Sequence, residues 1–145
     1  MSRVRFRTVT NLYVGLDGFY ATVPLSKGYR LRMDFELCEP YDGDRWPVVV
    51  AMFAYQGRYS LRRACESDGL ATGPGGLAVV GVALDLLEKA EPEARRRWPD
   101  RKLRMELEGA NETLYRVYKR FLTPRGYRPT DWDYELVKDL AQEDT

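Results

Sequence analysis

The segment around Tyr118 combines a helix-start signal with a phenol that could take part in acid–base chemistry. It reads Asn111-Glu-Thr-Leu-Tyr-Arg-Val-Tyr118, and Gly126-Tyr127 follows eight residues after the tyrosine. Asparagine is favoured directly before a helix, and the apolar residues recur at three- and four-residue spacing. A phenol on this helix can donate a proton or a hydrogen bond to a leaving group. The alternative is that Tyr118, one of ten tyrosines, packs for its apolar body.

A glycine-rich loop is the candidate site for a phosphate group. Residues 69–76 contain Gly73, Gly75 and Gly76, and an apolar helical pattern starts at Leu77. Backbone N–H groups at a helix start bind phosphate, and glycines let the ligand come close to the backbone. The alternative is a tight strand-to-helix connection that needs glycine conformations. Pro74 removes one backbone donor from the loop.

Glu66 is the carboxylate placed best to act as a general base. It stands near the end of a strand predicted before the glycine loop, and Glu106 and Glu108 on a later strand are further candidates. A general base must reach the proton that it removes. In a chain with 22 acidic residues, each of these groups is alternatively a solvated surface residue. Cys65 has no histidine and no helix start beside it to favour its thiolate, so we do not expect it to be a nucleophile.

The absence of histidine excludes several common kinds of active site. The chain has no histidine and only two cysteines, Cys38 and Cys65, which are far apart. This composition rules out a Ser-His-Asp triad, a Cys-His pair and the common zinc sites. Acid–base chemistry then falls to Glu, Asp, Tyr, Lys, Cys or water.

Charge and hydropathy restrict the partners. The chain has 23 basic and 22 acidic residues, which argues against a generic polyanion binder. Arginines grouped at residues 3–7 and 95–104 could contact phosphate, or could form solvated faces balanced by nearby acidic residues. No apolar run approaches the roughly 20 residues that a membrane span needs, and the first residues lack the apolar core of a secretory signal. We expect a cytoplasmic protein without a membrane segment, and we do not expect nucleic acid as a partner.

The first half of the chain reads as strands. The clearest alternation spans residues 29–37, while residues 47–55 are continuously apolar, as in a central strand covered on both faces. Asp17-Gly18 predicts a hairpin turn. Strands are predicted at residues 3–8, 12–16, 19–24, 29–37, 47–55 and 59–66.

The second half mixes helices and strands. A helix is predicted over 77–90, with an end or kink at Glu91-Pro92 and a further turn over 93–98. A strand follows at 102–108, then a helix from Asn111 that stops at Pro124-Arg-Gly126. Residues 127–137 read as a final extended segment. Without repeats or linkers, we expect a single domain over 1–145, of mixed α/β class with a mostly antiparallel sheet and flanking helices.

Residues 111–127 resemble the C-terminal half of the GCN5-related N-acetyltransferases, where Asn-x-x-Ala-x-x-Leu-Tyr precedes a Gly-Phe or Gly-Tyr pair. Antiparallel strands followed by glycine loop, helix, strand, helix and strand is the element order of that family, and the resemblance covers about residues 48–137. The family signature is Gln/Arg-x-x-Gly-x-Gly/Ala. Gly73 and Gly75 match its glycines, whereas Leu70 replaces the Gln or Arg. The first half departs from typical members, which have one strand and two helices there.

The resemblance implies acetyl-CoA as the acyl donor and a primary amine, on a small molecule or a protein, as the acceptor. It implies that two neighbouring central strands, at 59–66 and 102–108, splay apart to hold the pantetheine. Glu66 or a water would take the amine proton, and Tyr118 would protonate the departing thiolate. Coenzyme A would be bound by Gly73, Gly75, Gly76, Leu77 and Asn111.

The departures from the family favour a hypothesis of another class. Leu70 and Pro74 both weaken the expected phosphate cradle. The chain would then be a non-catalytic interaction or inhibitor protein that keeps the scaffold and has lost coenzyme A binding, since fold does not fix function. Its protein partner would contact the row of arginines or the aromatic residues Tyr13, Phe19, Tyr20 and Trp46.

Overall fold

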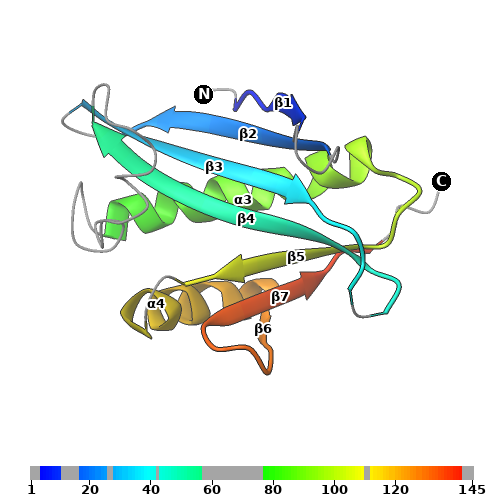
Figure 1. Ribbon diagram of the computed structural model, residues 1–145. Helices are drawn as coiled ribbons and strands as arrows, with labels where there is room; N and C mark the ends of the chain where they lie inside the picture. Colours follow the sequence, from blue (N-terminus) through cyan, green and yellow to red (C-terminus); the bar gives the residue numbers. More distant parts are fainter. Residues whose placement is uncertain are drawn as a thin grey trace.

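The computed structural model describes residues 4–10, 17–25, 28–41, 43–56, 77–109 and 112–141 (Figure 1). Two helices are described, α3 (Leu77–Arg97) and α4 (Glu112–Leu122), and the short 3-10 helix η2 (Thr123–Arg125) follows α4. The strands are β1 (Arg7–Thr10), β2 (Asp17–Pro24), β3 (Tyr29–Leu37), β4 (Trp46–Gln56), β5 (Leu103–Glu108), β6 (Arg128–Pro129) and β7 (Glu135–Asp139).

The strands form one seven-stranded sheet in the order β1-β2-β3-β4-β5-β7-β6. Every neighbouring pair is antiparallel except β4 and β5, which are parallel. Parallel neighbours need a long crossover connection, and α3 forms part of it. The predicted α/β class with a mostly antiparallel sheet is therefore confirmed.

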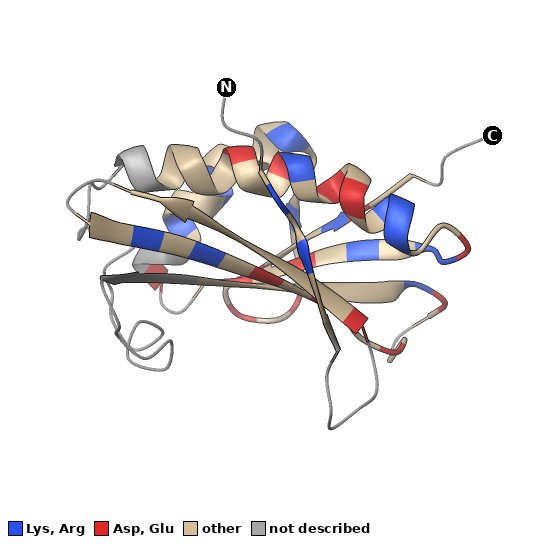
Figure 2. Ribbon diagram, turned by 90° about the horizontal axis from the view of Figure 1, so that it is seen from above, with Lys and Arg blue, Asp and Glu red and all other residues tan. Residues whose placement is uncertain are grey.

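Alternation along β3 divides the sheet into two faces. Leu31, Met33 and Phe35 are almost fully buried, whereas the residues between them are charged. Leu86 of α3 and Leu122 of α4 belong to the same core cluster, so both helices pack on this face. Figure 2 shows the helical layer over the sheet and the charges that follow one another along the strands. The opposite face, called the outer face below, carries Arg30, Arg32, Asp34, Glu36, Val49, Arg104, Glu106 and Glu108.

The turn predicted at Asp17-Gly18 is wrong. Both residues lie in β2 and pair with β1. A Cβ atom on Gly18 would lie 2.7 Å from the carbonyl oxygen of Phe35. Glycine is therefore needed here because β2 and β3 come close together, and not because the chain turns. The strand predicted at 12–16 lies outside the described residues.

Two further elements differ in extent from the prediction. Helix α3 does not end at Pro92 but runs on to Arg97 and includes the predicted further turn. Proline costs a helix interior about 3 kcal/mol, and the complete burial of Ala90 and Ala94 on either side offsets that cost. The extended segment predicted at 127–137 divides into β6 and β7, joined by a loop in which Tyr134 has a φ of 64°.

Neither of the described helices is long and apolar enough to cross a membrane. Among the described residues, no three His, Cys, Asp or Glu side chains are grouped so that they could hold a metal ion.

Candidate functional site

Strands β4 and β5 run side by side for a short distance and then part. Their parallel pairing extends from Trp46 and Leu103 to Val50 and Leu107. Beyond Val50, β4 continues to Gln56 and stays paired with β3 on its other side. Figure 1 shows β4 and β5 diverging toward their C-terminal ends. A strand that loses a neighbour keeps a row of backbone N–H and C=O groups along that edge.

The register identifies the backbone groups on this edge. The N–H of Trp46 donates to the carbonyl of Lys102 on the β5 side, at 2.7 Å, whereas the carbonyl of Pro47 accepts from Cys38 on the β3 side, at 2.8 Å. Successive residues of a strand direct their backbone groups to opposite neighbours, and the β3–β4 pairing is uninterrupted. The groups that face away from β3 beyond the ladder belong to Met52, Ala54 and Gln56; no described strand pairs with them, and they are called the free edge of β4.

The strand that parts from β5 is β4, and the prediction that residues 59–66 neighbour β5 is wrong. Strand β5 pairs with β4 on one side and with β7 on the other, so both of its edges are taken. The segment 59–66 itself lies outside the described residues.

Most of the residues assigned from the sequence to catalysis or cofactor binding also lie outside the described residues, namely Glu66, Gly73, Gly75, Gly76 and Asn111. Helix α3 begins at Leu77, as predicted, and α4 begins directly after Asn111. The first turn of α3 contains no acidic residue. The positive end of its helix dipole is therefore not neutralised by its own side chains, and such an end attracts anions.

Tyr118 lies on α4 with its ring in the core. The residue is 7% exposed, and burial raises the pKa of its phenol to about 12 because the phenolate would be poorly solvated. No other described residue forms a hydrogen bond with its hydroxyl. This phenol is protonated at neutral pH and has a proton to donate, while its ring also serves the packing of α4 against the sheet.

A buried carboxylate lies on the outer face beside the point where β4 and β5 part. Glu106 of β5 is 7% exposed and accepts a hydrogen bond of 2.6 Å from the Tyr41 hydroxyl. Burial raises the pKa of Glu106 although the hydrogen bond opposes it, and the negative charge of Glu135 adds to the rise. Partial burial and the bond to Glu106 likewise raise the pKa of Tyr41. A carboxylate in this state accepts a proton more readily than an ordinary glutamate does.

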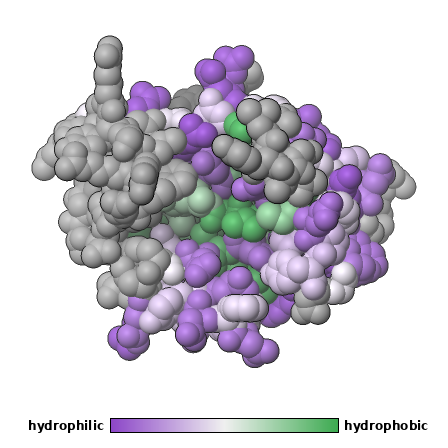
Figure 3. Space-filling view, viewed as in Figure 1, coloured by the Kyte–Doolittle hydropathy of each residue, from purple (hydrophilic) through white to green (hydrophobic). Residues whose placement is uncertain are grey.

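The surroundings of Glu106 are partly apolar. Glu106 pairs with Val49 of β4, which is 39% exposed, and the next pair, Val50 with Leu107, is the last one of the β4–β5 ladder. Figure 3 looks onto the outer face and shows hydrophobic residues gathered at the centre, where Figure 1 shows β4 and β5, with hydrophilic residues around them. Glu106 therefore combines a buried carboxylate with an apolar border, the setting in which enzymes tune acids and bases.

The surroundings of the described cysteine disfavour its thiolate. Cys38 follows β3, and its pKa is raised first by burial and then by the negative charges of Glu36 and Glu106. A raised pKa keeps the thiol protonated, and the thiolate is the reactive form.

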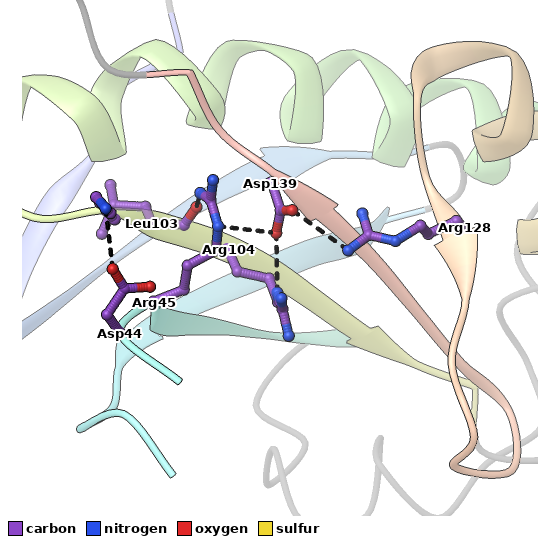
Figure 4. A network of polar contacts seen from close by, with 7 residues as sticks. Asp44, Arg45, Leu103, Arg104, Arg128 and Asp139 are labelled. Atoms are coloured by element: carbon purple, nitrogen blue, oxygen red, sulfur yellow. Dashed lines mark hydrogen bonds and ion pairs between the residues drawn. The ribbon is translucent and has the colours of Figure 1, made fainter. Parts of the chain in front are cut away.

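Three arginines surround one carboxylate at the other end of β5 (Figure 4). Asp139 of β7 lies 2.9 Å from Nε of Arg104, 3.5 Å from Nε of Arg45 and 3.3 Å from Nη2 of Arg128. Arg45 also donates to the carbonyl of Leu103 at 3.2 Å. Burial acts to raise the pKa of Asp139, but the hydrogen bond from Arg104 and the three positive charges together lower it.

No protein-family model, no curated protein and no solved structure matches this chain.

The sequence indicated some of these groups and missed others. Glu106 was, together with Glu108, a further candidate for the general base on the strand predicted at 102–108. Arg104 was grouped by sequence distance with residues 95–97, whereas it lies on the outer face with Asp139. Tyr41 was missed because it belongs to a turn segment, and no local pattern shows that it reaches a strand 65 positions away.

Proposed function

We propose that this chain is an N-acetyltransferase that moves an acetyl group from acetyl-CoA directly to a primary amine, on the scaffold of the GCN5-related family. The observation that carries the proposal is the parting of β4 from its parallel neighbour β5, after which no described residue pairs with the free edge of β4. Parallel strands joined through a helix usually bind ligands beyond their carboxyl ends. The resemblance noted in the sequence requires two such strands at this place.

The described elements offer groups that fit the donor. The backbone N–H groups of the free edge can donate to the thioester carbonyl and to the amides of the pantetheine, as an oxyanion site does. The start of α3 has no acidic residue in its first turn and can hold the pyrophosphate together with Gly73, Gly75 and Gly76. Leu77 is the first residue of that helix, and we assign Asn111, which precedes α4, to the same site.

Three proton and bond changes complete the transfer. A carboxylate, Glu66 or the described Glu106, accepts a proton from the ammonium form of the acceptor, and the neutral amine attacks the thioester carbon. The new C–N bond forms as the C–S bond breaks, with the negative charge on the carbonyl oxygen held by the free edge of β4. Tyr118, whose pKa of about 12 keeps its phenol protonated beforehand, donates its proton to the departing sulfur, and the phenol is restored through water by the second proton that the acetylated nitrogen releases as it becomes a neutral amide.

A substitution in β4 tests the donor site. Ala54→Pro removes an N–H group that faces away from β3, so the ladder with β3 stays intact. Ala54→Val keeps the N–H and is the matched control. We expect calorimetric titration to show acetyl-CoA binding to the wild type and to Ala54→Val, and weaker binding to Ala54→Pro. Tyr118→Phe should bind the donor normally but transfer the acetyl group more slowly. Equal binding by both Ala54 variants, or no binding at all, would contradict the proposal.

A second function is favoured by the exposure of large aromatic residues. Phe19, predicted from the sequence to contact a partner, is instead buried in the core at 1% exposed, whereas Trp132 is 70% exposed and Tyr41 is 62% exposed. Aromatic residues are enriched in protein–protein contacts. A non-catalytic interaction protein on the same scaffold would fail to bind acetyl-CoA, and Trp132→Ala would reduce its affinity for a partner.

A further inference from the structure

The outer face changes from basic to acidic along one line of β5. Arg104 and Glu106 are two residues apart, so their side chains leave the same face at positions about 7 Å from each other. Glu108 extends the line toward the place where β4 and β5 part. Strand β7 repeats this order, because Asp139 with its arginines stands beside Arg104 and Glu135 stands beside Glu108. The basic end and the acidic end therefore belong to one continuous surface.

The basic end has more positive than negative charge. Within the described residues, Arg45, Arg104 and Arg128 share the single carboxylate of Asp139. Three guanidinium groups less one carboxylate leave a charge of roughly +2 at this place. Arg128 is 52% exposed and holds Asp139 through one nitrogen only. A guanidinium has five N–H donors, so within the described part of the chain most of those on Arg128 remain for another acceptor.

The acidic end suits an ammonium group. Glu106 lies one register position before the end of the β4–β5 ladder, and on the side away from Arg104 its neighbours are the carboxylates of Glu108 and Glu135. An ammonium at Glu106, opposite Val49, therefore lies about 10 Å along β4 from Met52, where the free edge that receives the acetyl group in the proposed function begins.

We infer that the acceptor is a small zwitterion, whose carboxylate or phosphate binds Arg45, Arg104 and Arg128 while its amine lies against Glu106. The inference rests on the proposed function, because it states which amines that site accepts. Guanidinium groups bind carboxylate and phosphate through paired hydrogen bonds, which fixes the orientation of the ligand. An amine without an anionic group provides no negative charge for the arginines to bind. An anion without an amine provides no positive charge for the carboxylates at the other end.

Titration calorimetry without acetyl-CoA tests the inference. The probes are γ-aminobutyrate and ε-aminocaproate, compared with hexanoate and hexylamine, which carry only one of the two charges. We expect at least one of the two amino acids to bind about tenfold more tightly than either single-charge probe, because one additional charge-assisted hydrogen bond is worth about that factor in affinity. Arg128→Gln should weaken that binding about tenfold. Arg96→Gln, an exposed arginine paired with Glu93 on α3, is the matched control and should bind as the wild type does.

Each outcome separates the two proposals. Equal binding of hexylamine and ε-aminocaproate, equal behaviour of the two arginine variants, or no heat with any probe would overturn the zwitterion site. Acetyl-CoA is titrated on its own. Amino-acid binding without acetyl-CoA binding would overturn the transferase and leave the zwitterion site supported. Acetyl-CoA binding without a preference for the amino acids would overturn the zwitterion site alone.

Discussion

Removing the cation from the ion pair between α3 and β7 should cost the protein much of its stability. Glu91 of α3 is 9% exposed and accepts a hydrogen bond of 2.7 Å from Nζ of Lys138. The Tyr127 hydroxyl reaches the other oxygen of Glu91 at 3.4 Å, which is a weak contact. Lys138→Met keeps most of the side-chain volume but leaves the carboxylate of Glu91 buried beside that tyrosine alone.

The magnitude follows from the burial of the two partners. Breaking a buried ion pair by removing one partner costs about 3–5 kcal/mol. The Lys138 side chain is 27% exposed and that of Glu91 is 11% exposed, so water can relieve part of the cost. We therefore expect a loss near the lower end, about 3 kcal/mol, which for a chain of this size lowers Tm by about 10 °C.

Urea unfolding followed by circular dichroism measures this loss in a double-mutant cycle. The variants are Lys138→Met, Glu91→Gln and the combination of both. The double variant has no buried charge to solvate and should recover most of the stability that Lys138→Met loses. The reasoning fails if Lys138→Met costs less than about 1 kcal/mol, or if adding Glu91→Gln to it restores nothing.

Three further substitutions have expected outcomes. The pKa of Glu106 is raised in the folded protein. Its stabilising effect is therefore complete below about pH 4.3, the pKa in the unfolded chain, and is lost as pH rises through the pKa in the folded protein. Urea titrations should show that Glu106→Gln gains stability relative to wild type between about pH 4 and pH 8. The pKa of Asp139 is lowered, so its contribution is present above about pH 3.9 and is lost on acidification; Asp139→Asn should cost about 1 kcal/mol at neutral pH and nothing at pH 2, and an equal cost at both would contradict the ion-pair assignment. A Cβ on Gly109 would lie 2.9 Å from the backbone nitrogen of Tyr115, so Gly109→Ala should cost about 1–3 kcal/mol, whereas the control Gly81→Ala, with open space around its Cβ, should stabilise α3 slightly; thermal unfolding that ranks the two in the opposite order would refute this.

Local sequence patterns are enough to predict strands with strict alternation and the ends of helices. Strand β3 occupies 29–37 as predicted, because its period of two already fixes which residues face the core. The stop predicted at Pro124-Arg-Gly126 falls on η2, which follows α4 directly and ends at Gly126 with a φ of 96° that other residues adopt only with strain. The role of Gly18 was not predictable, because it depends on the carbonyl of Phe35 in another strand. The residues next to Gly18 in the sequence do not show which strand will lie beside it in the folded protein.

The candidate site depends on the same kind of distant contact. The sequence placed Glu106 on a strand as a candidate base, but its hydrogen-bond partner Tyr41 comes from the distant β3–β4 connection. The group around Asp139 takes its arginines from three separate segments, and strand order alone brings them together. The parting of β4 from β5 is likewise a property of pairing and not of either strand's composition.

The single parallel junction also bears on how the molecule folds. Strands β1 to β4 pair with their neighbours in sequence, and so do β6 and β7, so these contacts close short loops of chain. Pairing β4 with β5 instead closes a loop that contains all of α3, and long loops are slow to close because they lose more entropy. The N-terminal meander is thus expected to form early, with the junction completed late. A ligand bound across that junction would be lost first on partial unfolding, and would in turn slow the separation of the two halves of the sheet.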